Sequence, residues 1–133
     1  MTVQARIVAG PLRIERPFGL TGGGCGAAVE FQGVVRDSED GAPIAGIDYE
    51  CHARMAEAQL CRIAQQLASF FDLEELIVLH RVGPVPVGET SLYVRAIATR
   101  RHDAFVAVME LIEQLKRDVP IWKHPMPARQ GDT

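Results

Sequence analysis

Apolar residues recur at three- and four-residue steps in two long stretches of the chain, 53–71 and 103–117. This period places the apolar side chains on one side of a helix, so each stretch predicts an amphipathic helix that packs on a core. Asp103 is the expected N-cap of the second helix, because its carboxylate can accept a hydrogen bond from a first-turn amide, and Pro120 is expected to end that helix. The expected apolar stripes are Ala56, Leu60, Ile63, Leu67 and Phe70 in the first helix and Phe105, Val108, Met109, Ile112 and Leu115 in the second.

Shorter runs of alternating or continuous apolar residues predict strands. The polar stretch 37–43 contains the turn signal Asp40-Gly41 and predicts a hairpin between the runs on either side of it, whereas 83–88, with two prolines, predicts a loop. Strands grouped as hairpins around two helices indicate the α+β fold class, with the helices packed on a mainly antiparallel sheet in one domain, 1–133. The expected strands are 3–8, 12–16, 27–36, 44–51, 76–82 and 90–98, the last of them central because neither of its faces is polar.

A glycine-rich segment, 22–26, precedes the third of these strands. Such a segment can cradle phosphate when a helix N-terminus or a lysine follows it. A strand-like run follows it here, so the sequence favours a turn or a mobile loop over a nucleotide site.

Composition narrows the classes of function. The 133 residues are 47% hydrophobic and 23% charged, typical of a globular protein, and the net charge of −3 argues against general nucleic-acid binding. No run reaches the length of a membrane span and the first residues do not form a signal peptide, so we expect a cytoplasmic protein with its three cysteines reduced. The four histidines lack metal-ligand spacing, and we therefore expect no metal site. We also expect no cofactor.

Basic residues stand at the ends of the predicted elements. Arg36 closes a strand, Arg100 and Arg101 open the last helix, and Lys116 and Lys123 flank its end. Pro120 prevents both lysines from lying on one helix, so their ammonium groups can converge only if the chain turns back. Convergent element ends are a common way to build a small-ligand site, here for an anion, although such charges also occur as solvated surface.

Five motifs carry a resemblance to a known family. From about residue 28 to residue 123, in this order, the chain is similar to the catalytic, or large, subunit of molybdopterin synthase. The motifs are FQGVVRD (31–37), YECHARMAE (49–57), HRVGPVPVGE (80–89), RRHDAF (100–105) and KRDVPIWK (116–123).

The resemblance implies an α/β hammerhead fold with a smaller β subdomain and a homodimer at the centre of a heterotetramer. It implies a small ubiquitin-like sulfur-carrier partner whose C-terminal Gly-Gly thiocarboxylate enters a pocket of the large subunit. Two sulfurs would pass to cyclic pyranopterin monophosphate to form the dithiolene of molybdopterin. By position, the resemblance assigns Lys116 and Lys123 as active-site lysines, Arg36 and Arg101 as anion-binding arginines with Arg100 beside them, and Phe31 as an apolar residue of the pocket.

Several positions depart from the family pattern. Arg100 stands where the family has a histidine, with His102 the nearest substitute, and His52 replaces a tyrosine. His124 and Pro125 follow Lys123 in place of an acidic residue, and the sequence is shorter beyond them than in relatives. These departures keep open a non-catalytic relative that binds the carrier or a pterin without turnover, and an unrelated anion-binding domain is a third alternative.

Overall fold

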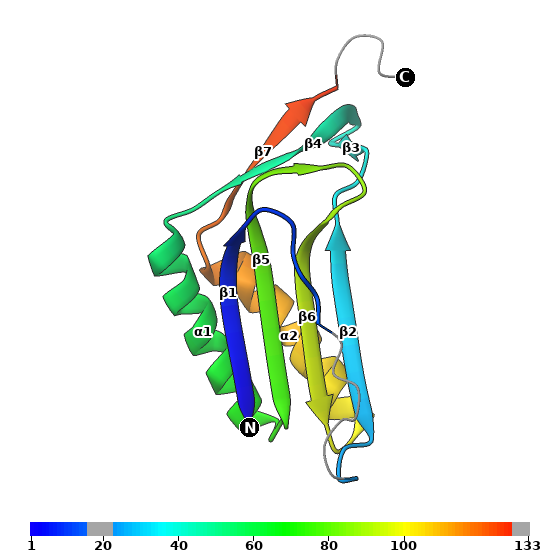
Figure 1. The fold of residues 1–133 in the computed structure, drawn as a ribbon, viewed down its shortest axis with the longest axis vertical. Helices are drawn as coiled ribbons and strands as arrows, with labels where there is room; N and C mark the ends of the chain where they lie inside the picture. The colour runs from blue at the N-terminus through cyan, green and yellow to red at the C-terminus, as the bar shows by residue number, and fades with distance from the viewer. Residues whose placement is uncertain (16–22, 129–133) are drawn as a thin grey trace.

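The computed structural model describes residues 1–15 and 23–128, which form two long helices and seven strands (Figure 1). Both predicted helices are present at almost the predicted bounds. The helices are α1 (Ala53–Phe70) and α2 (Arg101–Asp118), and the strands are β1 (Thr2–Ala9), β2 (Ala27–Val34), β3 (Ser38–Glu39), β4 (Ala42–Glu50), β5 (Glu75–Pro86), β6 (Thr90–Ala98) and β7 (Trp122–Pro127).

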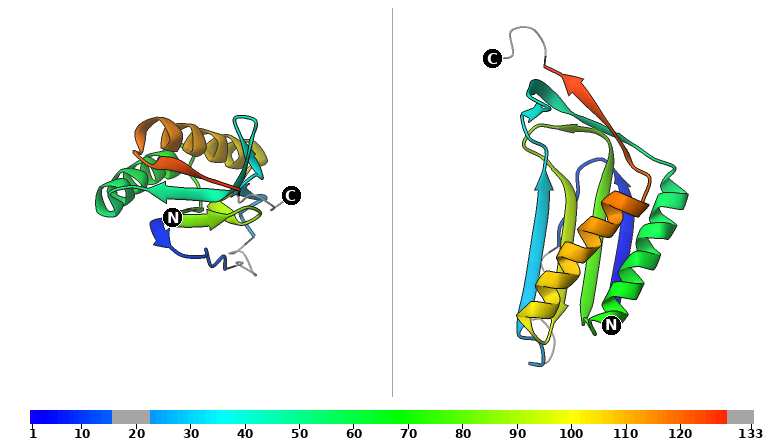
Figure 2. Two further views of the ribbon diagram at one scale, coloured as in Figure 1. Left: turned by 90° about the horizontal axis from the view of Figure 1, so that it is seen from above. Right: turned by 180° about the vertical axis from the view of Figure 1, so that it is seen from behind.

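The strands form a large and a small layer that share β5. In the large layer the order is β1-β5-β6-β2, with β1 parallel to β5 and the other pairs antiparallel, and both helices cover one face of it (Figure 2). In the small layer β4 pairs with the distal end of β5 on one side and with β7 on the other, and β3 adds a short hairpin. Gly83 has a φ of 86°, a conformation that favours glycine, where β5 passes from one layer to the other. This architecture confirms the α+β class with a mainly antiparallel sheet and a smaller β unit.

The main core lies between the helices and the large layer. Leu60 of α1 and Leu111 of α2 are fully buried against Val78 of β5 and Val94 of β6. Every residue of β6 from Ser91 to Ala98 is buried, as expected for a central strand with side chains packed on both faces.

The face that α2 buries differs from the predicted stripe. Phe105 and Met109 are 55% and 61% exposed, while Ala104, Ala107 and Leu111 are buried with Val108 and Leu115. The small alanines let the helix approach the sheet closely, and a pattern that weights large side chains misses them. In α1 the exception is Phe70, which is 81% exposed.

The predicted N-cap of α2 is wrong by three residues. Arg100 occupies the cap position, without a side-chain cap hydrogen bond, and Asp103 lies in the first turn 3.8 Å from the Arg100 guanidinium. The carboxylate still lies at the positive end of the helix dipole, which is the electrostatic part of the predicted role.

Three predicted strand features are also wrong. Residues 12–15 form no strand, because Leu12 and Ile14 instead pack on the open face of the sheet; Arg16 lies outside the described residues. The hairpin at Asp40-Gly41 joins β4 only to the two-residue β3, since β2 pairs with β6. Most of the predicted loop 83–88 belongs to β5. Within the glycine-rich segment, Gly22 lies outside the described residues and Gly23-Gly24 forms a turn.

Candidate functional site

A pocket of about 630 Å³ opens where the two layers and the end of α2 meet. Its walls come from the end of β2 and the residues after it, from β3, β4, β5 and β6, from the last turns of α2 and from β7. Apolar side chains form much of the lining, and the three permanent cations among the described lining residues are Arg36, Lys116 and Lys123.

The chain reversal after α2 brings the two lysines to one pocket. Lys116 lies in the last turn of α2, which ends at Asp118 before Pro120. The chain then returns as β7, where Lys123 pairs in register with Tyr49 of β4. Both lysines therefore line the pocket from different elements, as the sequence argument required.

Arg36 and Phe31 reach the pocket from β2 and its extension. Phe31 lies opposite Val94, a core residue of the helix-covered face, and is 37% exposed. Val35 is buried and its backbone amide donates to the Glu89 carbonyl at 3.1 Å, which fixes the chain beside Arg36. Four of the seven site residues named from the sequence thus share one pocket.

A carboxylate meets one of these cations. Glu39 of β3 lines the pocket and lies 3.5 Å from the Lys123 ammonium, with the two side chains 22% and 49% exposed. Sequence reasoning missed Glu39, because the polar stretch 37–43 reads only as a turn. The position of Glu39 immediately before the turn pair Asp40-Gly41 was the available signal.

The floor of the pocket holds three polar side chains that the sequence did not single out. The Tyr49 hydroxyl donates to Ser91 Oγ at 3.3 Å, and Ser91 Oγ donates to the Gly33 carbonyl at 3.3 Å. His80 is buried, with its ring edge-on to Tyr49 at 5.1 Å between centroids. Its Nδ1 lies 2.8 Å from the Arg81 carbonyl, which can only accept, so Nδ1 carries the proton.

Burial lowers the pKa of His80 below its usual value, against the smaller opposing effect of that hydrogen bond. The ring is therefore neutral at pH 7 and presents Nε2 as an acceptor, and no described side chain or backbone group bonds to this nitrogen. His80 thus adds hydrogen-bond capacity to the pocket and leaves its positive charge to the lysines and Arg36.

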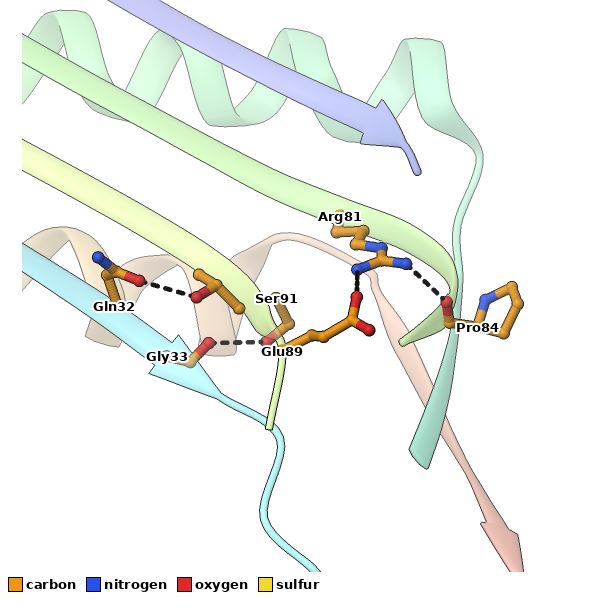
Figure 3. Close-up of polar contacts among 7 residues, drawn as sticks. Gln32, Gly33, Arg81, Pro84, Glu89 and Ser91 are labelled. Atoms are coloured by element: carbon orange, nitrogen blue, oxygen red, sulfur yellow. Dashed lines mark hydrogen bonds and ion pairs between the residues drawn. The ribbon is translucent and has the colours of Figure 1, made fainter. Parts of the chain in front are cut away.

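Beside the pocket, a buried arginine braces the connection between β5 and β6 (Figure 3). Arg81 lies 2.7 Å from the Glu89 carboxylate and donates to the Pro84 carbonyl at 3.2 Å. Thr90 donates to the Gln32 side-chain oxygen at 2.8 Å, so the start of β6 is held to β2 as well. This network fixes the strand ends around the pocket, and Arg81 itself is committed to it.

The other three predicted site residues lie at the opposite end of α2. Arg101 and Lys116 are fifteen residues apart on one helix, which at 1.5 Å per residue separates their backbones by about 22 Å. Arg100 lines a different depression of about 610 Å³ with Phe70 and Phe71, and His102 is exposed in the first turn. Within one chain, Arg100, Arg101 and His102 do not reach the pocket.

A second polar cluster lies on the sheet face away from the helices. Arg95 donates to Glu75 at 2.9 Å and to the Glu15 carbonyl at 2.6 Å, and the Tyr93 hydroxyl donates to Glu30. Burial and then the Glu30 hydrogen bond raise the pKa of Tyr93 to about 12. The cluster ties the segment after β1 to the sheet.

Among residues 1–15 and 23–128, no group of three or more histidine, cysteine or acidic side chains is placed to hold a metal ion. Neither of the two helices is long and apolar enough to cross a bilayer.

The arrangement defines a class of protein: two helices on a mainly antiparallel sheet, with a basic pocket where a smaller β unit joins it. The same fold occurs in a solved molybdopterin synthase from Staphylococcus aureus, with a TM-score of 0.85 and 28% identity over 96% of this chain and 93% of that one. A second match is a Helicobacter pylori structure described as a protein–protein complex of subunits 1 and 2 of molybdopterin-converting factor. The match covers 81% of this chain and 75% of that one, with a TM-score of 0.64 and 23% identity. It is a likeness of fold alone.

Sequence comparison gives the family. The family model described as MoaE protein matches residues 8–118, and the chain belongs to this family. A molybdopterin synthase catalytic subunit from Drosophila willistoni is 38% identical over 119 residues, or 88% of this chain. The chain spans 32% of the length of that relative and 51% of a rice relative of the same name.

Proposed function

We propose that this protein is a sulfurtransferase of molybdenum cofactor biosynthesis that acts as the catalytic subunit of a molybdopterin synthase. Sulfur would pass from the C-terminal thiocarboxylate of a small sulfur-carrier protein to cyclic pyranopterin monophosphate, and two transfers would complete the dithiolene. The observation that carries the proposal is the convergence of Lys116, Lys123 and Arg36 in one partly apolar pocket. We also propose that the protein acts in the cytoplasm.

The charges of the pocket suit the proposed chemistry. A thiocarboxylate tail and a phosphorylated pterin are both anions, so their meeting requires compensating positive charge held in advance. We assign Lys116 to the carbonyl end of the thiocarboxylate, Lys123 to orientation of the pterin and proton transfer, and Arg36 to phosphate. Phe31 would pack against the ligand near the pocket mouth. Sulfur delivery is then largely a matter of positioning two bound reactants.

An exposed apolar strip on α2 leads towards the pocket and supports a protein partner. Phe105 and Met109 are one helical turn apart and exposed, and Ile112, the next residue on that side, lines the pocket. Large exposed apolar side chains in a row mark interaction surfaces. We propose that the body of the carrier lies on this strip while its Gly-Gly tail enters the pocket.

Homodimerisation would reconcile the predicted arginines with the geometry. Because Arg101 lies about 22 Å from Lys116 along α2, it can serve this pocket only from a second copy of the chain. A two-fold symmetric dimer with antiparallel α2 helices places the start of one α2 near the end of the other, and the proposed dimer contact leaves the exposed apolar strip on α2 to the carrier. We propose that Arg100, Arg101 and His102 of one copy complete the phosphate site of the other, within a heterotetramer.

Reconstitution tests the proposal. The purified chain is mixed with a thiocarboxylated carrier and cyclic pyranopterin monophosphate, and dithiolene product is measured. The Lys116→Ala variant should lose turnover by about a hundredfold or more, in the range for removal of a preorganised charge, while keeping its thermal stability because the side chain is exposed. The matched control is Arg117→Ala, which removes the neighbouring exposed cation outside the pocket.

Wild-type product with an active Arg117→Ala and an inactive Lys116→Ala supports the assignment. Near-normal turnover by Lys116→Ala refutes it. A complex that forms without product identifies the non-catalytic relative instead.

A further inference from the structure

The ion pair between Glu39 and Lys123 has an unusual setting for a surface pair. Among the described residues that line the pocket, Glu39 contributes the one carboxylate. It shares this lining with the three cations Arg36, Lys116 and Lys123. It lies 3.5 Å from the flexible cation on β7 and forms no other ion pair within residues 1–15 and 23–128. A negative charge within an anion pocket opposes binding of the ligand, so its presence there requires a role.

The two partners differ in mobility. Glu39 immediately precedes the turn formed by Asp40 and Gly41, whose φ values of 51° and 80° are those of a tight two-residue hairpin turn. The backbone that carries Glu39 is therefore held by a short, well-defined loop, and the Glu39 side chain is less exposed than that of Lys123, at 22% against 49%. Lys123 carries its charge on a four-carbon stem with many rotamers. When the pair separates, the lysine is the side chain that moves.

We propose that Glu39 is the resident counter-ion of Lys123 and competes with anionic ligands for it. In the empty pocket Glu39 holds the ammonium group at the wall. A ligand carboxylate or phosphate draws Lys123 away, and the ion pair with Glu39 is exchanged for one with the ligand. Glu39 thus acts as a positioning residue that lowers affinity for adventitious anions and reserves Lys123 for a ligand with several contacts in the pocket. This inference rests on the anion-binding character of the proposed function.

Charge removal tests the exchange. Binding of inorganic phosphate and of a synthetic peptide ending in Gly-Gly with a free carboxylate is measured by calorimetry at pH 7 and low salt. The fluorescence of Trp122, the only tryptophan in the sequence, follows the same titrations from the position next to Lys123. The Glu39→Gln variant should bind at least one probe about two- to fivefold more tightly, the size expected for a partly exposed ion pair. The gain should shrink in high salt.

Two further variants isolate the cause. Asp40→Asn removes the adjacent carboxylate, which does not line the pocket, and asparagine tolerates the same positive φ, so its affinities should match the wild type. In a Lys123→Ala background, Glu39→Gln should lose most of its gain, since no ion pair remains to break. The probe that shows the gain identifies whether a carboxylate or a phosphate takes Lys123.

Equal or weaker binding by Glu39→Gln overturns the inference, as does an undiminished gain without Lys123. If the wild type binds a probe in a Lys116-dependent way and Glu39→Gln changes nothing, the anion pocket stands and the exchange fails. If neither protein binds either probe, the proposed function and the exchange fail together. Thermal unfolding of each variant confirms that it is folded.

Discussion

The placement of Arg101 and Lys116 at opposite ends of α2 makes a shared site testable by subunit mixing. Arg101→Ala and Lys116→Ala each remove one charge from every site of the proposed homodimer, so each variant alone should be nearly inactive. If the two side chains act together across the dimer, a mixed dimer contains one site with both residues intact and one site with neither. Random exchange places half of the subunits in mixed dimers, and half of those sites are complete.

The expected recovery is therefore about one quarter of wild-type activity for a one-to-one mixture. The structure sets this figure because about 22 Å of helix prevents the two side chains from meeting within one chain. The assay is product formation after the variants are mixed, exchanged under mild denaturant and refolded, with each variant alone as the baseline. The control mixture combines Lys116→Ala with Arg117→Ala in place of Arg101→Ala. Arg117→Ala also removes one cation, but it retains every residue proposed for the site. No recovery in the Arg101→Ala mixture, with verified exchange, refutes the shared site.

Two buried groups give pH-dependent predictions. Burial lowers the pKa of His80 in the folded protein. As pH falls below about 6.5, the unfolded chain therefore binds a proton at His80 more readily than the folded chain does. The free energy of unfolding then declines by at most about 1.4 kcal/mol per pH unit. His80→Asn should flatten this decline between pH 7 and 5 in urea unfolding, and an unchanged slope would contradict it. With the pKa of Tyr93 raised to about 12, the unfolded state ionises first above about pH 10, and stability is lost as pH rises. Tyr93→Phe should remove that loss, and ultraviolet titration of the native protein should show one tyrosine ionising near pH 12; normal ionisation of both tyrosines would refute the assignment.

The helices and the central strand were predictable because their signals are strong and local. An apolar period of 3.6 residues defines α1 and α2, and apolar residues on both sides of 90–98 indicate burial on two faces. The condition for convergence of Lys116 and Lys123 was also predictable: Pro120 excludes one continuous helix, so the two lysines can meet only if the chain turns back. The prediction that Arg36 joins the two lysines rested on the family resemblance and on the position of Arg36 at the end of a predicted strand.

Other features depend on contacts between distant segments. The alternation at Leu12 and Ile14 looks like a strand, but their partners are Ile77, Leu79 and Tyr93 on the sheet face. β2 pairs with β6 in place of β4, and α2 packs on both of these strands, an arrangement that local turn chemistry does not encode. Glu39 enters the site only through the small β layer, whose assembly no local pattern describes. His80 pairs within the large layer and meets Tyr49 of the small layer at the pocket. At the start of α2, Arg101 fits the family motif and Arg100 departs from it, and neither reaches the pocket of a single chain.

The dependence of the pocket on β7 has a consequence for biosynthesis of the protein. Lys123 belongs to the last described strand, and that strand is held by β4, which is synthesised some seventy residues earlier. A chain emerging from the ribosome can therefore form α1 and pair β5 with β6 while the pocket still lacks a wall. Nascent chains at this stage would not capture the proposed carrier tail productively, so binding competence should arise only after residue 123 has left the exit tunnel. Incomplete chains would thus not withdraw the proposed carrier from completed ones.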